Sequence, residues 1–410
     1  MKIGNFTKQN NLTKDTIRHY IDLGILNPQK INNQYNFTGN DQKTLDQILR
    51  LKSLNFTLNE IKNIILTKKL GNLDSKTSSY LYKKYYLQKS REIKEEIKSL
   101  KKIDKELNKE IDTLLLQEEN SKTKIGIPLN SIHLLQCPVC HSDLKIHRGN
   151  IEENQILEGV LKCSCQKEYV VKDGILIVSD TPFESHYDYP KDFLLNYIDN
   201  TRNELLENVY KNSEWFSNII PNNFFRNKIL LEIGSGIGFF LNNIYDDLSE
   251  DTTYISVDLN FDSQIFLKKR LESKGIQKNM VFICSDFKEM PVKTNSVDIL
   301  IDYLTSSNFA FRNKDFLMEN LEKYLKKESA LLSGYIIFEK FKKNSRIKSD
   351  FKKYLILKNI ESKLFEMNYK VLSQKQLPSF FIDGELGKYE DFTVPGEVIS
   401  TYLYFGKRQG

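Results

Sequence analysis

Hydrophobic residues recur at heptad spacing between residues 80 and 119. Steps of four and three residues alternate there, as they do at the a and d positions of a coiled coil, and neither Pro nor Gly interrupts the run. The pattern predicts one long helix over residues 80–119 that pairs with a second copy of the chain. One row of the seam is Ile93, Leu100, Leu107 and Leu114, and the other is Ile97, Asp104 and Ile111.

The apolar stripe of this helix is narrow, and a helix so rich in Lys and Glu is not stable in isolation. The alternative to a dimer seam is a solvated helix packed against its own domain. In an antiparallel pair, Asp104 would approach its own copy near the two-fold axis, because it lies midway between Ile93 and Leu114. A lone acid there would specify register rather than add stability.

Cap and turn signals before the long helix predict a small helical domain. A helix over residues 4–9 is followed by a second one that Thr13 caps and that ends at Leu23, where Gly24 is the stop signal. A strand or wing is expected at residues 34–37, and two further helices at residues 41–54 and 58–66. A helix, a short turn, a helix and a wing form the layout of a winged helix-turn-helix DNA binder.

The charge distribution supports a polyanionic partner for this domain. The chain of 410 residues has a formal net charge of +6, and residues 1–76 contain twelve Lys and Arg against six Asp and Glu. These residues therefore account for the whole excess, and the remainder of the chain balances. A basic amino-terminal head points to nucleic acid.

Short motifs recur through the head in a characteristic order: Ile3-Gly4, Thr16-Ile17-Arg18-His19-Tyr20, Leu23-Gly24-Ile25-Leu26, Pro28 and Tyr35. In these motifs the head, assigned to residues 1–76, resembles the MerR family of transcription regulators over about its first 70 residues, which implies promoter DNA as a partner. Family regulators dimerise through a long antiparallel helix, which fits residues 77–120.

The resemblance implies that Arg18 and Tyr20 contact the DNA backbone and major groove, and that a wing near Tyr35 binds phosphate. The family's wing usually carries Arg where Asn36 stands, so one phosphate contact is lost, about one unit of salt-dependence slope. The candidate DNA-binding residues are Lys14, Thr16, Arg18, His19, Tyr20 and Tyr35.

Four of the five cysteines lie between residues 137 and 165, as a Cys-x-x-Cys and a Cys-x-Cys pair. Two thiolate pairs on tight turns can surround zinc tetrahedrally. The one-residue spacing of the second pair leaves His141 or His147 as substitute ligands, and a redox dithiol is a further alternative that lacks a thioredoxin-like pattern around it. The fifth cysteine, Cys284, is expected in a buried strand. The candidate metal ligands are Cys137, Cys140, Cys163 and Cys165.

This segment, residues 121–181, resembles the zinc ribbons that precede the catalytic domain of large-subunit ribosomal RNA guanine methyltransferases. The matching features are Cys137-Pro-x-Cys140, the later cysteine pair, and Tyr169 followed by Asp173-Gly-Ile. Those enzymes usually complete the site with a His, where this chain has Lys167, so four cysteines are the implied ligands. Four protein ligands imply a structural zinc with no open position.

Residues 182–410 alternate between strand and helix patterns, which predicts a doubly wound, Rossmann-like α/β domain. Strands are expected at 228–233, 254–259, 280–284, 297–301, 331–338, 369–372 and 399–405, and helices at 187–220, 262–274 and 350–367. The fold class is thus multidomain α and α/β: a winged helix-turn-helix, a long dimerisation helix, a zinc ribbon and this domain.

Glycines and acids mark a ligand site at the carboxyl ends of the expected strands, where parallel sheets bind ligands. Asp258 is placed to accept both hydroxyls of a ribose, and Asp286 with Phe287 to meet an adenine. An acid at Glu232 suits an amino-bearing ligand and disfavours a pyrophosphate. The candidate cofactor-binding residues are Glu232, Gly234, Ser235, Gly236, Gly238, Asp258, Asp286 and Phe287.

This constellation is similar to the class I S-adenosylmethionine-dependent methyltransferases over residues 225–335, which implies that cofactor. Asp302, Tyr303 and Asn308 would then line the acceptor side, with Asp302 and Tyr303 as candidate catalytic residues. Methyl transfer depends mainly on positioning and needs no protein nucleophile. The amino-methylating Asn-Pro-Pro-aromatic signature is absent, and the acceptor is left open between RNA and a small molecule.

Three hypotheses follow for the whole chain: a homodimeric DNA-binding regulator with a methyltransferase body, an enzyme whose head serves recruitment or autoregulation, and a sensor that binds the cofactor without turnover. No signal peptide is recognisable and no run of eighteen apolar residues exists, so we expect a cytoplasmic protein without a membrane partner.

Overall fold

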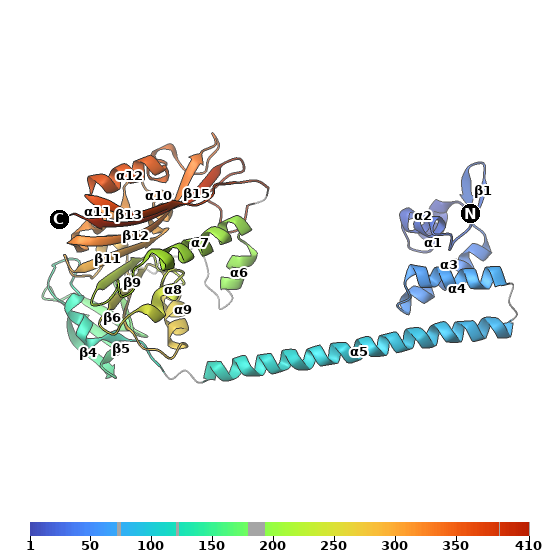
Figure 1. Cartoon of the computed structure of the whole chain (residues 1–410), viewed down its shortest axis with the longest axis horizontal. Helices are drawn as coiled ribbons and strands as arrows, with labels where there is room; N and C mark the ends of the chain where they lie inside the picture. Colours follow the sequence, from blue (N-terminus) through green and yellow to red (C-terminus); the bar gives the residue numbers. More distant parts are fainter. Residues whose placement is uncertain (72–74, 120–122, 179–192, 385, 410) are drawn as a thin grey trace. The chain divides into compact units, whose positions relative to one another are not determined.

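The computed structural model describes residues 1–71, 75–119, 123–178, 193–384 and 386–409, and Figure 1 shows the whole chain. Contacts between residues divide the chain into two compact units, Met1–Gln117 and Glu118–Gly410. Each unit has its own hydrophobic core and is described separately. Among the described residues, no helix is both long and apolar enough to cross a membrane.

The first unit begins with the expected small helical domain. Thr13 caps the second helix by accepting a hydrogen bond from the Thr16 backbone N at 3.1 Å, which confirms its predicted start. Two short antiparallel strands form the wing. The elements are α1 (Ile3–Gln9), α2 (Lys14–Asp22), β1 (Gln29–Ile31), β2 (Gln34–Asn36), α3 (Gly39–Ser53) and α4 (Leu58–Gly71).

The long helix α5 (Ser75–Glu119) packs its first turns against this domain. Lys89 is almost fully buried there, and its Nζ lies 2.7 Å from Glu60 of α4 and 2.9 Å from Glu92 of its own helix. The Gln47 side chain of α3 donates to the Tyr82 hydroxyl at 3.0 Å. The beginning of α5 is therefore part of the head's core.

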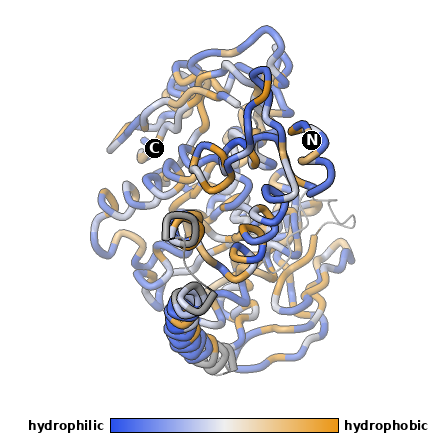
Figure 2. The backbone as a smooth tube through the Cα atoms, turned by 90° about the vertical axis from the view of Figure 1, so that its right-hand side faces the viewer, coloured by the Kyte–Doolittle hydropathy of each residue, from blue (hydrophilic) through white to orange (hydrophobic). Residues whose placement is uncertain are grey.

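Beyond these contacts, the apolar row of α5 is exposed to solvent. Leu100 and Leu107 are 57% and 58% exposed, and Ile103 joins the row beside Asp104 with 49%. Figure 2 colours most of this helix as hydrophilic, in keeping with its many Lys and Glu residues. The predicted helix is confirmed, whereas its pairing stays a prediction, and the side chain of Leu114 lies outside the described residues.

The second unit is built on one sheet whose central part has the expected strand pattern. The order β13–β15–β12–β11–β8–β9–β10 is parallel except for β15, which runs antiparallel to both of its neighbours. From β8 the chain continues outward to β9 and β10 on one side and then crosses to β11 on the other side. The strand order therefore reverses between β8 and β11, which is the switch point of the sheet. The strands are β8 (Ile229–Ile233), β9 (Thr253–Asp258), β10 (Asn279–Cys284), β11 (Val297–Tyr303), β12 (Leu325–Lys340), β13 (Tyr369–Gln376) and β15 (Val398–Arg408), with the short β14 (Phe380–Phe381) beside β15.

The cysteine-bearing segment continues this same sheet. Its last strand, β7, pairs in parallel with β10, and the Gln136 backbone N donates to the Pro291 carbonyl at 2.9 Å. Side chains from the segment and from the central strands share one hydrophobic core. This segment, residues 123–178, is here called the ribbon for its antiparallel strands, and it is anchored to the α/β sheet by main-chain hydrogen bonds. Its strands are β3 (Ile127–Pro128), β4 (Lys145–Glu152), β5 (Gln155–Lys162), β6 (Glu168–Lys172) and β7 (Ile175–Ile177), after which no residue from 179 to 192 is described.

Two expected helices of the second unit differ from the prediction. The helical stretch at 187–220 is two helices, because Arg202 between them is extended at φ −64°, ψ 148°, and its residues 187–192 lie outside the described part. The expected helix at 350–367 is two 3-10 turns and one α-helix, because Ile356 is extended. The helices are α6 (Phe193–Asp199), α7 (Asn203–Ile219), α8 (Leu241–Ile244), α9 (Phe261–Glu272), α10 (Thr305–Ala310), α11 (Leu317–Leu321) and α12 (Leu357–Glu366), with 3-10 turns at Leu129–Leu134, Tyr245–Asp247, Phe287–Glu289, Glu322–Tyr324, Ser349–Phe351 and Lys353–Leu355.

Candidate cofactor and acceptor site

The glycine loop after β8 requires glycine at its first and last positions. Gly234 has φ +60°, and a Cβ there would collide with the Thr305 side chain at the start of α10. Gly238 has φ +81°, and its Cβ would collide with Leu267 of α9. The loop therefore passes close to two helices and leaves no room for a side chain at either position.

Asp258 at the end of β9 is bound to this loop. One carboxylate oxygen accepts a hydrogen bond from the Gly236 backbone N at 2.8 Å, and the other accepts one from the Asn260 backbone N at 2.8 Å. Burial raises the pKa of Asp258, and the two backbone N–H groups oppose that shift by stabilising the carboxylate. The acid lies beside the loop, as its position after the second strand predicted.

Glu232 near the end of β8 is a buried acid. It is 1% exposed and accepts a hydrogen bond from the Tyr254 hydroxyl at 2.8 Å. Burial raises its pKa from 4.5 to about 8, since a carboxylate loses its hydration there. A cationic ligand group beside it would restore the ionised form, so the side chain is suited to an amino-bearing ligand.

A cavity of about 230 Å³ opens at the switch point between β8 and β11. The Tyr303 hydroxyl donates to the Val209 carbonyl of α7 at 2.9 Å, so α7 and the end of β11 enclose it together. Residues of α6 and α7 line this cavity, and the two helices are here called the lid helices. None of the described residues that line it is Lys or Arg. The lining consists of Tyr197, Leu205, Val209, Glu232, Gly234, Ser235, Gly236, Ile237, Phe239, Phe240, Tyr303, Leu304, Asn308, Ile336, Tyr389 and Phe392.

Part of the predicted site lines this cavity and part lies elsewhere. Asp286 is exposed and accepts from the Lys288 backbone N, and Phe287 beside it is half-buried against the core. The predicted residues that line the cavity are Glu232, Gly234, Ser235, Gly236, Tyr303 and Asn308, and those that do not are Gly238, Asp258, Asp286, Phe287 and Asp302.

The expectation that Asp302 lines the acceptor side needs correction. Its side chain is fully buried, and one oxygen accepts from the Ser306 backbone N at 2.9 Å at the start of α10. Burial raises its pKa to about 6. Within the part of the chain that the structure describes, no atom donates to its second oxygen. Asp302 thus holds the start of α10, whereas Tyr303 and Asn308 lie at the cavity.

Aromatic residues of the lid helices and the C-terminal loops make up much of the wall, and the sequence analysis missed them. The Tyr197 ring of α6 lies 5.6 Å from Phe239 and 5.1 Å from Tyr389, measured between centroids. Phe392 stacks on Phe311 at 4.4 Å. These residues follow no sequence motif and come from positions far apart in the chain. Their aromatic character was the one signal that could have found them.

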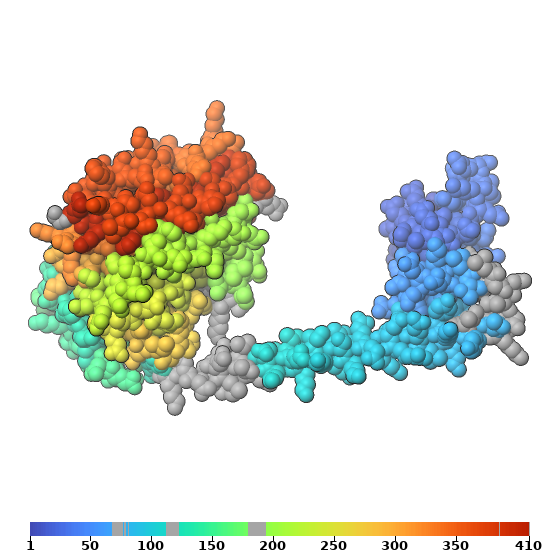
Figure 3. All heavy atoms as spheres, viewed as in Figure 1, coloured from blue at the N-terminus to red at the C-terminus, as the bar shows by residue number. Residues whose placement is uncertain are grey.

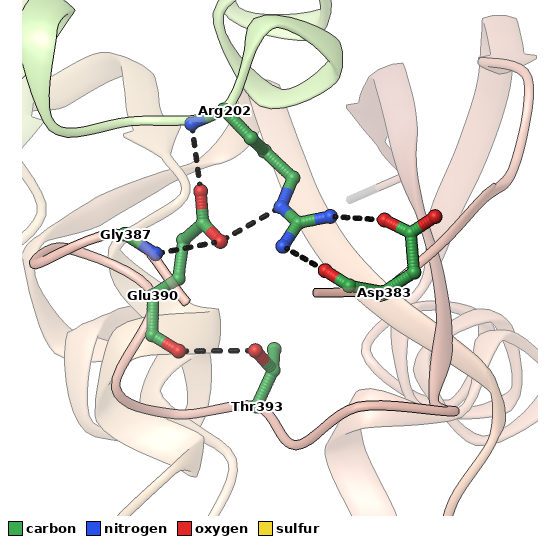
Figure 4. A network of polar contacts seen from close by, with 5 residues as sticks. All are labelled: Arg202, Asp383, Gly387, Glu390 and Thr393. Atoms are coloured by element: carbon green, nitrogen blue, oxygen red, sulfur yellow. Dashed lines mark hydrogen bonds and ion pairs between the residues drawn. The ribbon is translucent and has the colours of Figure 1, made fainter. Parts of the chain in front are cut away.

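An ion pair clamps the lid helices to the C-terminal loop that carries Tyr389 and Phe392 (Figure 4). The Glu390 side chain is 2% exposed and accepts from the backbone N and the Nε of Arg202, both at 2.8 Å. The same guanidinium donates to the Asp383 carbonyl at 3.1 Å, and the Gly387 backbone N donates to Glu390 at 3.3 Å. The clamp fixes two walls of the cavity relative to each other.

The four clustered cysteines converge in the ribbon. Their sulfur atoms all lie within 4.8 Å of one another, and none of them is in a disulfide. Sulfurs around a tetrahedral zinc are about 3.8 Å apart, given Zn–S bonds of about 2.3 Å. The Sγ atoms of Cys137 and Cys165 are 3.9 Å apart, close to that spacing, whereas those of Cys163 and Cys165 are 2.9 Å apart, closer than a bound zinc would leave them. Four converging thiols are nevertheless a donor set that zinc prefers. Neither His141 nor His147 belongs to this group.

The head presents most, but not all, of its predicted DNA-binding residues. Arg18 is exposed and lies 3.5 Å from Asp15, and Tyr35 of the wing is half-buried beneath Lys30 Nζ, 5.0 Å from its ring centroid. Tyr20 is only 2% exposed in the core, which does not agree with its predicted DNA contact, and its hydroxyl accepts a hydrogen bond from Lys52 Nζ at 3.5 Å. Lys14 and His19 are exposed, and Thr16 is half-buried beside Thr13.

Comparison with known proteins agrees with the two units. A model of the MerR helix-turn-helix family of regulatory proteins matches residues 1–68, and a methyltransferase domain model matches residues 225–383. No curated protein matches the chain.

Solved structures similar to this chain include methyltransferases. A S-adenosylmethionine-dependent methyltransferase from Aquifex aeolicus is 14% identical, with a TM-score of 0.35, covering 54% of this chain and 99% of its own. A phosphoethanolamine N-methyltransferase from Haemonchus contortus is 12% identical, with a TM-score of 0.39, covering 59% and 62%. A geranyl diphosphate C-methyltransferase from Streptomyces coelicolor is 11% identical, with a TM-score of 0.37, covering 56% and 90%.

The family models and the geometry of both units lead to one assignment: the chain carries a MerR-type helix-turn-helix domain at residues 1–68 and a methyltransferase domain at residues 225–383.

Proposed function

We propose that this protein is a dimeric DNA-binding regulator whose second unit transfers a methyl group from S-adenosylmethionine to an acceptor. The observation that carries the proposal is the cavity at the switch point, where the glycine loop, Glu232 and Tyr303 converge under the lid helices. Ligands bind at this place in open α/β sheets.

The residues present suit S-adenosylmethionine. Glu232 is buried where an amino group would ionise it, and Asp258 lies against the glycine loop where ribose hydroxyls would meet it. Asp286 and Phe287 follow β10, on the side expected for the adenine. When bound, the cofactor supplies an electrophilic methyl group on a sulfonium.

On the acceptor side, the chain's contribution is orientation and the exclusion of water. Tyr303 is held by its hydrogen bond to Val209, and Asn308 offers an amide at the same wall. An acceptor lone pair held in line forms the new bond to the methyl carbon, while the C–S bond breaks and its electron pair remains on sulfur. Such a step needs no nucleophile from the protein.

Dimerisation is supported by the exposed apolar row of α5. Ile97, Leu107 and Ile111 are each about half exposed, a pattern that a second copy of the helix would cover. A Leu107→Lys variant should sediment as a monomer at a concentration where the unchanged protein is a dimer. A monomeric unchanged protein at every concentration would refute the dimer.

A structural zinc at the four cysteines completes the proposal. The four thiolates would hold it and leave no open position, so it would stabilise the ribbon and take no part in methyl transfer.

The deciding experiment is a methylation assay with labelled S-adenosylmethionine against RNA and metabolite extracts. Label transfer that is lost in a Gly236→Asp variant supports the enzyme. Cofactor binding without transfer to any fraction would instead support a sensor. Promoter DNA shifted by the protein, with and without cofactor, tests whether the second unit controls the head.

A further inference from the structure

A strongly basic segment lies next to the cavity at the switch point, and it plays no part in the function proposed so far. This cavity is here called the acceptor cavity, after the wall that Tyr303 and Asn308 contribute beside the cofactor-binding residues. Residues 340–358 contain eight Lys and Arg and a single acid, Asp350. Every basic side chain of this segment is exposed or half-exposed. The total charge of the chain hides this surplus, because acids elsewhere balance it. The eight are Lys340, Lys342, Lys343, Arg346, Lys348, Lys352, Lys353 and Lys358.

Aromatic rings are interleaved with these cations. Phe351 is half-buried, so part of its ring remains at the surface, whereas the half-buried Phe341 stacks on Phe338 at 4.5 Å between ring centroids. Lys352 Nζ lies 4.7 Å from the Phe341 ring centroid, and Lys348 Nζ lies 5.7 Å from that of Phe351. Residues 340–358 are part of the orange region at the surface of the second unit in Figure 3.

The segment also lines an open cavity of about 620 Å³ that adjoins the acceptor cavity. Its cationic lining residues are Arg312, Arg346 and Lys348, and its one acid is Asp391. Arg346 is oriented by its hydrogen bond to the Asp391 carbonyl at 2.9 Å. The two cavities share Asn308, Tyr389 and Phe392 in their walls, so they lie side by side.

This combination has a specific physical meaning. A single anionic group needs one or two cations, whereas eight within nineteen residues match a chain of phosphates. Partly exposed rings among the cations offer stacking surfaces for bases, and duplexes conceal the base faces that such stacking requires. The acceptor cavity itself has an aromatic wall without Lys or Arg among its described lining residues, which suits an uncharged base.

We propose that Arg312 and residues 340–358, here called the basic surface, bind single-stranded nucleic acid and place one unstacked base of it in the acceptor cavity. The inference rests on the proposed methyl transfer and names its acceptor class: a base of a polynucleotide. A nitrogen of that base would take the methyl group, and its displaced proton would leave to solvent. The surface lies in the second unit, apart from the duplex-binding residues assigned to the head.

The test uses the full chain and a labelled 20-nucleotide single-stranded RNA, followed by fluorescence anisotropy at several salt concentrations. Excess unlabelled duplex DNA occupies the head in every titration. The test variant is R346Q/K348Q, and the charge-matched control is K269Q/K274Q, at the end of α9 and just beyond it. A Phe351→Leu variant keeps the apolar contact and removes the stacking surface.

R346Q/K348Q should weaken RNA binding on the order of tenfold and lower the slope of log K against log salt by about 1.4, for two lost single-strand phosphate contacts. Phe351→Leu should weaken binding at unchanged slope, and the control should bind as the unchanged protein does. Equal RNA affinity in test and control variants would overturn the inference, as would elimination of RNA binding by the duplex competitor.

Calorimetry with S-adenosylmethionine on the same variants separates this inference from the proposed function. Unchanged cofactor affinity with lost RNA affinity supports the basic surface. Methyl transfer confined to small molecules would overturn the inference and leave the methyltransferase intact. Absence of cofactor binding in the unchanged protein would contradict the proposed function itself.

Discussion

Replacing Arg202 with Met should destabilise the second unit and loosen its lid. The Glu390 carboxylate is 2% exposed and the Arg202 side chain 12% exposed, so the pair is desolvated. Removing one partner of a buried ion pair leaves the other charge without compensation, which costs about 3 kcal/mol or somewhat more. In the variant, the backbone N–H groups of residue 202 and Gly387 still donate to Glu390, so the loss of folding free energy stays near about 3 kcal/mol.

The chain provides a specific probe for this measurement. Trp215 is the single tryptophan, lies on α7 and packs against the core of the second unit. Urea unfolding followed by its fluorescence therefore reports on the lid helix and its unit, and not on the head. A double-mutant cycle of Arg202→Met and Glu390→Gln should show a coupling energy of about 2 kcal/mol.

A matched control ion pair lies on α7, the helix that carries Trp215. Lys211 and Glu207 form an ion pair at 2.8 Å, but their side chains are 42% and 66% exposed. Lys211→Met should therefore cost no more than about 0.5 kcal/mol. If Arg202→Met cost as little as Lys211→Met, or if the cycle showed no coupling, the clamp would not stabilise the lid.

Three further predictions concern the other sites. Because burial raises the folded-state pKa of Glu232 from 4.5 to about 8, the folded protein holds a proton that the unfolded chain has released. The cofactor-free protein should therefore lose stability as the pH rises from about 4.5 to 8, measured by urea unfolding. Glu232→Gln should flatten this dependence of stability on pH, and an unchanged dependence in the variant would contradict the buried acid. Cys163→Ser should release zinc, measured by elemental analysis, whereas the control Cys284→Ser should retain the metal. Because the ribbon and the sheet share a core, Cys163→Ser should also lower the melting temperature of the second unit. Arg18→Ala should weaken promoter DNA binding in a gel shift, whereas Lys102→Ala on the distal part of α5 should not; equal shifts would misplace the recognition helix.

Local sequence signals predicted the element types well. Thr13 before an amphipathic stretch and the glycines after an apolar strand are short-range features, and the structure has the corresponding helix and loop. The heptad pattern likewise predicted α5, because periodicity over many residues needs no tertiary information.

Tertiary contacts decided what the sequence could not show. The break between α6 and α7 occurs at Arg202, which bonds to a residue 188 positions later in the chain. Asp302 and Tyr303 are neighbours in β11, and successive side chains of a strand point to opposite faces, so only one of them faces the cavity. The Tyr20 ring was placed on DNA by family resemblance, whereas packing places it in the core.

The charge of the second unit was misjudged as balanced, for a different reason. Balanced totals beyond residue 76 concealed the surplus of residues 340–358, because acids distant in sequence cancel it only in the sum. Electrostatic fields act within a Debye length of about 8 Å at physiological salt, so the local surplus determines which partner binds there.

A calorimetric titration of S-adenosylmethionine into the full-length protein tests the central claim most directly. We expect one site per chain in the unchanged protein and no measurable binding for Asp258→Ala, because this variant removes the carboxylate that lies against the glycine loop. Absence of binding to the unchanged protein, or equal affinity in the variant, would contradict the assignment of the site.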